Sequence, residues 1–104
     1  MKHFNVAIIG AGPAGAIAAQ HLASKGYSVL MLDRKSEVGT PVQCGEAITK
    51  YSLEKMNIST KQPWIIQSVK GIKILLPKNK YFYSTVPGYS IDRRQFDQWL
   101  VNQA

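Results

Sequence analysis

Three glycines and one carboxylate in the first third of the chain have the types and spacing that bind a phosphorylated ligand. The glycines Gly10, Gly12 and Gly15 give the pattern G-x-G-x-x-G within "IIGAGPAGAIAA", residues 8–19. The first allows a tight turn, the second lets the backbone approach a pyrophosphate, and the third lets a helix pack closely on a strand. Asp33 can accept hydrogen bonds from ribose hydroxyls, and its charge disfavours a 2′-phosphate. These residues predict a dinucleotide site.

Such a site needs a strand before the turn and a helix after it. The apolar run from Asn5 to Ile9 predicts a buried parallel strand. A helix is predicted from Ala14, with Gly26 as its C-terminal cap. A second strand, Ser28 to Leu32, stops at the acid. The predicted βαβ unit spans residues 4–33.

The middle of the chain predicts a loop, a short helix and a hairpin. Residues 34–58 begin with a loop rich in glycine and proline, and then Ala47, Ile48 and Tyr51 fall at helical spacing. An antiparallel hairpin within residues 65–87 is predicted from two strands, Val69 to Leu76 and Tyr81 to Val86, joined by "PKNK".

The last predicted helix covers residues 92–102. Asp92 is its expected N-cap, Gln95 closes a capping box, and Ile91 and Phe96 occupy the staple positions. Core-facing positions are predicted at Phe96, Trp99 and Leu100.

Composition narrows the class of protein. Thirteen Lys and Arg against six Asp and Glu give a net charge of +7, which favours anionic partners such as a phosphorylated cofactor or an acidic membrane surface. No zinc spacing, RNA-binding signature or basic helix points to nucleic acid, and no metal site is predicted. No apolar stretch has the length of a membrane span. The lone Cys44 cannot form an internal disulfide, and we expect a cytoplasmic protein.

Three stretches together resemble a known family: "VAIIGAGPAG", "LDRKSEVGTPVQCGEAI" and "IDRRQFDQWL". They are similar to the geranylgeranyl reductase family of FAD-dependent oxidoreductases, and most of all to archaeal digeranylgeranylglycerophospholipid reductases. That family lies in the larger glutathione-reductase-like class. The resemblance covers nearly the whole chain but only the N-terminal part of such an enzyme.

The resemblance implies a set of cofactor contacts. Where the family usually has Glu, this chain has Asp33, one methylene shorter, and where it usually has Gly, this chain has Ala47. Cys44 would line the flavin side rather than act as a nucleophile. A cation is unfavourable in the first turn of a helix, so Arg93 is expected to reach an anion such as the pyrophosphate, and Arg94 to face solvent. The implied FAD contacts are Ala14, Gly15, Asp33, Cys44, Gly45, Ala47 and Arg93.

The implied fold is a Rossmann-like α/β FAD/NAD(P)-binding domain, incomplete here, with a hairpin from the substrate-side sheet. The implied activity is saturation of isoprenoid C=C bonds of a prenyl lipid, by a protein in peripheral contact with an anionic membrane. The motifs specify neither a catalytic residue nor an electron donor, and we expect these 104 residues to be inactive alone. Two alternatives stay open: a flavin monooxygenase of the aromatic-hydroxylase type, and a non-catalytic dinucleotide-binding piece.

Overall fold

The computed structural model describes residues 2–104, which form two compact units. The first unit contains the residues up to Gln43 together with Arg93–Ala104, and the second is Cys44–Asp92.

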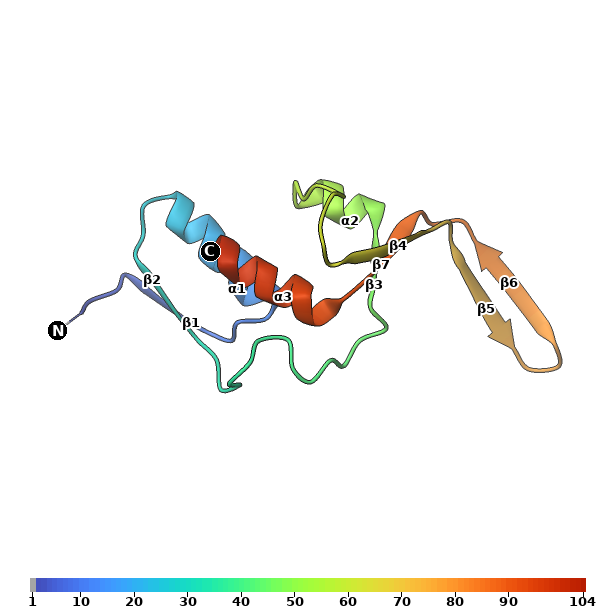
Figure 1. Ribbon diagram of the computed structural model, residues 1–104, viewed down its shortest axis with the longest axis horizontal. Coiled ribbons are helices and arrows are strands. Elements are labelled where there is room, and N and C mark those ends of the chain that lie inside the picture. Colours follow the sequence, from blue (N-terminus) through green and yellow to red (C-terminus); the bar gives the residue numbers. More distant parts are fainter. Residues whose placement is uncertain (1) are drawn as a thin grey trace. The chain divides into compact units, whose positions relative to one another are not determined.

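The first unit is built on the predicted strand–helix–strand. Strand β1 (Val6–Ile9) and strand β2 (Val29–Leu32) pair in parallel, with Val6 opposite Val29. Helix α1 (Pro13–Ser24) connects them (Figure 1). It ends before Gly26, whose φ of +90° lies in the left-handed region that favours glycine.

Helix α3 (Arg93–Gln103) completes this unit by packing beside α1 (Figure 1). The side-chain amide of Gln20 donates a 2.8 Å hydrogen bond to the carbonyl of Leu100 and ties the two helices together. The buried apolar side chains of the two helices are Ala16, Ala19, Phe96 and Leu100, as predicted for the last two. Trp99 is half-buried.

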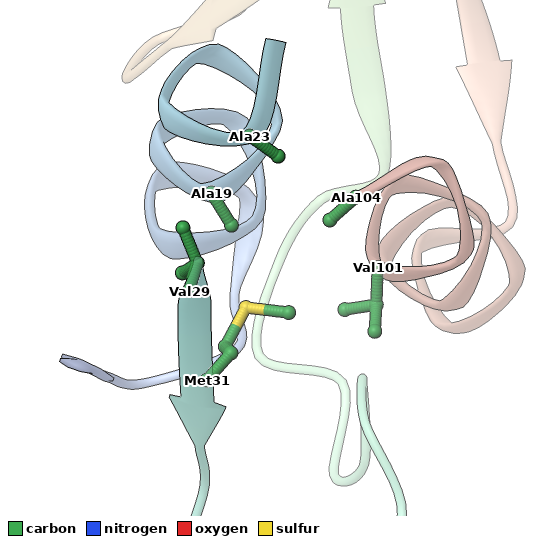
Figure 2. A pocket seen from close by; sticks show the side chains of 6 residues that line it. All are labelled: Ala19, Ala23, Val29, Met31, Val101 and Ala104. Atoms are coloured by element: carbon green, nitrogen blue, oxygen red, sulfur yellow. The ribbon is translucent and has the colours of Figure 1, made fainter. Parts of the chain in front are cut away.

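An apolar hollow of about 300 Å³ lies between α1, β2 and α3. Figure 2 shows Met31 of β2 and Val101 of α3 pointing toward each other across it. Apolar side chains are also exposed on the strand pair, with Ile9 81% and Leu32 47% accessible. Much of the strand pair's apolar surface is therefore not covered by residues 2–104. The hollow is lined by Ala19, Ala23, Val29, Met31, Val101 and Ala104.

The second unit contains a three-stranded antiparallel sheet in the order β3-β7-β4 and a separate hairpin. Strand β7 lies between the other two strands and pairs with both. The buried apolar side chains of this second unit are Leu53, Trp64 and Ile91. Its elements are β3 (Ala47–Thr49), α2 (Lys50–Lys55), β4 (Ile65–Val69), β5 (Ile72–Leu76), β6 (Lys80–Ser84) and β7 (Gly88–Ile91).

The predicted short helix begins later than expected. Ala47 and Ile48 are not helical, because they pair with Ser90 and Tyr89 of β7. Thr49 then caps α2, its hydroxyl accepting a 3.0 Å hydrogen bond from the amide of Ser52.

The predicted hairpin is present, but both of its strands have other bounds, and the second, β6, covers Lys80–Ser84 instead of Tyr81 to Val86. Val69, predicted to begin the first strand of the hairpin, belongs to β4, where it pairs with Gly88 of β7. The first strand of the hairpin, β5, therefore starts only at Ile72. An added Cβ at Gly71 would lie 2.3 Å from the carbonyl oxygen of Ser84, which explains the glycine where one strand gives way to the next. Strand β7 was not predicted at all.

Candidate functional site

Two glycines of the turn between β1 and α1 are required by the protein itself. Gly10 has a φ of +107°, which side-chain-bearing residues rarely adopt, and its amide donates a 2.6 Å hydrogen bond to the carbonyl of Leu32. A Cβ added at Gly15 would lie 1.9 Å from the carbonyl oxygen of Gly10. The helix can therefore approach the turn only with glycine at this position.

Gly12 is different, because neither its backbone conformation nor its packing against residues 2–104 requires a glycine. Its φ of −73° and ψ of −175° are ordinary extended values, and an added Cβ would meet no protein atom within 4 Å. Neither strain nor packing explains a glycine here. The space in front of this backbone is open, which is what a phosphate approaching the turn would require.

The N-terminus of α1 is ready to receive an anion. Gly12 is its N-cap and provides no side-chain hydrogen bond, and no acidic residue lies in its first turn. The amides of Ala14 and Gly15 lie in that turn, where backbone N–H groups have no partner inside the helix. These groups and the helix dipole attract negative charge.

Asp33 fastens the glycine turn to the end of β2. One carboxylate oxygen accepts a 2.8 Å hydrogen bond from the amide of Ala11, and the other accepts one of 2.8 Å from the amide of Lys35. These two bonds, that from Ala11 first, lower the pKa of Asp33 below its ordinary value. The lowered pKa keeps the carboxylate ionised, and the side chain is exposed beside the turn. Each carboxylate oxygen has a further lone pair that can accept a hydrogen bond from a hydroxyl group.

Arg93 lies at the start of α3 and forms an ion pair within its own helix. Its Nε donates a 2.9 Å hydrogen bond to Asp97, and its Nη2 donates a second of 3.3 Å to the other carboxylate oxygen. The Arg93 side chain is 28% exposed and that of Asp97 is 9% exposed. The carboxylate of Asp97 therefore compensates the positive charge of Arg93, which is unfavourable at the N-terminus of a helix. That Arg93 also binds the pyrophosphate stays a prediction.

Arg94 is exposed, as predicted, with 56% of its side chain accessible, and it also has a partner that the sequence did not indicate. Its guanidinium forms an ion pair with Glu37 from the loop after β2, and this pair lowers the pKa of Glu37. The neighbouring Gln98 donates a 3.1 Å hydrogen bond to the carbonyl of Val38. These contacts attach the loop to α3.

Sequence reasoning did not identify Gly39 as part of this attachment. Its φ is +81°, and an added Cβ would lie 2.8 Å from the Cα of Arg94. The glycine in "EVGT" was available as a signal, but only the structure shows which helix comes so close to it.

The remaining predicted contacts lie in the second unit. Cys44 and Gly45 are exposed in the loop that leads to β3, and Ala47 is exposed at the start of that strand. The sulfur of Cys44 accepts a 3.3 Å hydrogen bond from the amide of Glu46. The structure thus brings Asp33 together with the glycine turn, while Cys44, Gly45 and Ala47 form a separate group in the other unit.

Residues 2–104 contain neither a cluster of metal ligands nor a helix suited to a bilayer. No three His, Cys, Asp or Glu side chains gather there as metal ligands. No helix in that range has the length and apolar character to span a bilayer.

Comparisons with known proteins agree with this geometry. Residues 8–57 match the family of NAD(P)-binding Rossmann-like domains. A digeranylgeranylglycerophospholipid reductase from Methanopyrus kandleri is 43% identical over 101 residues, covering 97% of this chain and 26% of the relative. Another reductase of the same name, from Methanosphaera stadtmanae, is 35% identical and covers 100% of this chain and 28% of the relative.

Solved structures also include a protein similar to geranylgeranyl reductases and others that share the fold. A geranylgeranyl bacteriochlorophyll reductase-like protein from Thermoplasma acidophilum superposes with a TM-score of 0.87 at 32% identity, covering 96% of this chain and 27% of that one. The myxobacterial halogenase CndH, an FAD-dependent halogenase, gives a TM-score of 0.70 at 19% identity, covering 96% and 26%, and therefore shares the fold alone. The predicted Rossmann-like α/β fold and the predicted resemblance to geranylgeranyl reductases are confirmed. The chain spans about a quarter of the length of the relatives that it matches.

Proposed function

We propose that this chain is the FAD-binding portion of a flavin-dependent reductase that saturates isoprenoid C=C bonds of prenyl lipids. The chain covers only about a quarter of its reductase relatives. The proposed activity of the whole protein is therefore supported by its similarity to these reductases and by the geometry of the glycine turn.

The observation that carries the proposal is the unexplained glycine at position 12. Gly10 and Gly15 are required by backbone conformation and by packing, whereas the Cβ of a residue at position 12 would enter open space. That space lies at the N-terminus of α1, which has no side-chain cap, and backbone amides and the helix dipole favour phosphate there. A dinucleotide pyrophosphate fits these residues in charge and in hydrogen-bonding capacity.

In this proposal, the chain's residues hold the pyrophosphate and a ribose of the cofactor. Gly10, Gly12, Ala14 and Gly15 form the pyrophosphate turn. Asp33 serves two purposes, because its carboxylate already orients the amide of Ala11 and can also accept ribose hydroxyls.

FAD is favoured over a nicotinamide dinucleotide by the resemblance to geranylgeranyl reductases and by the fold shared with an FAD-dependent halogenase. When bound and reduced, FAD would supply a hydride to one carbon of the double bond, and a proton added to the other carbon would complete the saturation. The residues proposed to lie toward the flavin and the pyrophosphate, on the strength of the family pattern, are Cys44, Gly45, Ala47 and Arg93.

The test is an anaerobic turnover assay of the purified full-length reductase of which this chain is proposed to be a portion, with dithionite-reduced FAD and a digeranylgeranyl phospholipid. Mass spectrometry should show a gain of two hydrogens for each double bond reduced, and Gly12→Val should abolish the gain. Oxygen consumption with NAD(P)H, without any saturated lipid, would instead identify a monooxygenase. FAD binding without turnover in either assay would support the non-catalytic alternative.

A further inference from the structure

Asp97 is a buried charge in the first unit. Its side chain is 9% exposed, and among residues 2–104 no other charged residue is buried. The loop after β2 helps to cover it, because a Cβ added at Gly39 would lie only 3.3 Å from the Cβ of Asp97. Removing a carboxylate from water is costly unless a cation pairs with it. The cation that pairs with Asp97 is Arg93.

Asp97 holds one edge of the Arg93 guanidinium. The Nε and Nη2 groups of the arginine donate hydrogen bonds of 2.9 Å and 3.3 Å to the two oxygens of the carboxylate. A guanidinium is planar, and its five N–H groups point in fixed directions. Two bonds along one edge therefore also fix the directions in which the remaining N–H groups point.

The stability of helix α3 does not explain this ion pair. A cation in the first turn faces the positive end of the helix dipole. For ion pairs four residues apart, the more stabilising order has the acid N-terminal to the base, whereas here Arg93 precedes Asp97. A helix selected for stability alone would have the opposite order, so the position of the arginine needs another explanation.

The start of α3 lies at the same end of the first unit as the glycine turn. Helices α1 and α3 run side by side in the same direction (Figure 1). Gln20, whose side chain donates to the carbonyl of Leu100, is the eighth residue of α1, and Leu100 is the eighth residue of α3. The first turns of the two helices are therefore at the same level. Arg93 thus places its positive charge at the end where the amides of α1 attract an anion.

We propose that Asp97 is a positioning residue of the cofactor site. Its buried carboxylate orients the guanidinium of Arg93 so that the arginine donates hydrogen bonds to a pyrophosphate at the N-terminus of α1. This inference rests on the proposed function, because it requires a dinucleotide at the glycine turn. It assigns a role to a residue that neither the motifs nor the family pattern indicated.

The experiment is a double-mutant cycle in the full-length protein, with FAD affinity measured by titration calorimetry. Asp97→Asn should weaken FAD binding by about tenfold, which is within the range for members of one ion-pair network. Arg93→Gln should weaken it by about tenfold to a hundredfold, because hydrogen bonds to a charged group are lost. The double variant should bind FAD no more weakly than Arg93→Gln alone, because Asp97 acts through the arginine.

The melting temperature of the same variants without FAD separates positioning from folding. Arg93→Gln leaves the buried carboxylate without its cation and should lower the melting temperature. Adding Asp97→Asn should raise the melting temperature again, while FAD affinity stays low. If Arg93→Gln does not fold, Arg93→Lys takes its place in the cycle with the same expectation for FAD, since it keeps a cation but lacks the fixed fork.

The matched control is Glu37→Gln, which makes the same change of acid to amide in the neighbouring ion pair of α3. It should alter FAD affinity by less than about twofold, as expected for an exposed ion pair outside the site. A loss equal to that of Asp97→Asn would show that any broken ion pair on this helix weakens binding, and would overturn the inference.

Two other results would overturn it while leaving the proposed function intact. One is wild-type FAD affinity in Asp97→Asn. The other is an equal loss of affinity on Asp97→Asn with and without Arg93, which would reduce the pair to a structural contact of the helix. A wild-type protein that binds no FAD would instead overturn the proposed function, and this inference with it.

Discussion

Gly12→Val separates the ligand role of the turn from its structural role. A valine at this position keeps allowed backbone angles, and its Cβ meets no protein atom within 4 Å. Replacing glycine narrows the unfolded ensemble, worth about 0.4–1 kcal/mol of stability, while losing glycine at an N-cap costs a similar amount. We therefore expect the free energy of unfolding to change by less than about 1 kcal/mol.

Cofactor affinity should respond very differently. The branched side chain would occupy the space in front of the turn and separate a pyrophosphate from the amides of the first helical turn. Hydrogen bonds to charged groups contribute about 1.5–3 kcal/mol each, so losing two of them weakens FAD binding by roughly two to four orders of magnitude.

The assay pairs urea denaturation with a fluorescence titration of FAD. Gly15→Ala is the matched control, since its Cβ would lie 1.9 Å from the backbone oxygen of Gly10. Such overpacking typically costs about 1–3 kcal/mol, so this variant should lose stability as well as FAD. If Gly12→Val bound FAD with wild-type affinity, the reasoning about the open space would be refuted.

Three further changes test other parts of the site. Asp33→Ala should weaken FAD binding by about tenfold to a hundredfold and loosen the turn, measured by titration calorimetry; an unchanged dissociation constant would make Asp33 a structural fastener only. Cys44→Ser should retain FAD but shift its absorbance spectrum or alter turnover, whereas a covalent substrate adduct on Cys44 would identify a nucleophile. The pKa of Glu37 is lowered in the folded state from its ordinary value of 4.5. Its ion pair with Arg94 should therefore stabilise the fold fully at pH values above that ordinary pKa, and this stabilisation should be lost as the pH falls through the lowered pKa. Glu37→Gln should flatten the acid side of the stability profile, and an identical profile in both proteins would contradict this.

The βαβ unit was predictable because its signals are local. A strand, a glycine turn, a helix and a second strand follow one another within residues 4–33, and each is encoded by its own residues. The positive φ at Gly10 and the close approach at Gly15 are the geometries that the glycine pattern implies.

The second unit was harder because its strands depend on distant partners. Ala47 and Ile48 fit a helical pattern as well as a strand, and their partner strand β7 comes some forty residues later. Val69 likewise belongs to β4 only because Gly88 lies opposite it. Short apolar runs do not distinguish helix from strand by periodicity alone.

The surroundings of the site also depended on tertiary contacts. No local pattern shows that Glu37 pairs with Arg94 across the chain, or that Gly39 must lack a side chain where it meets α3. Asp33 was predicted as a ribose ligand, but its bond to the Ala11 amide appears only once the turn is folded.

The central claim, that the glycine turn binds FAD, is tested most directly by the absorbance spectrum of the purified protein. We predict flavin bands that remain with the protein after gel filtration and are released as free FAD on denaturation. A purified protein without these bands, which also fails to acquire them on incubation with FAD but binds NAD, would contradict the claim.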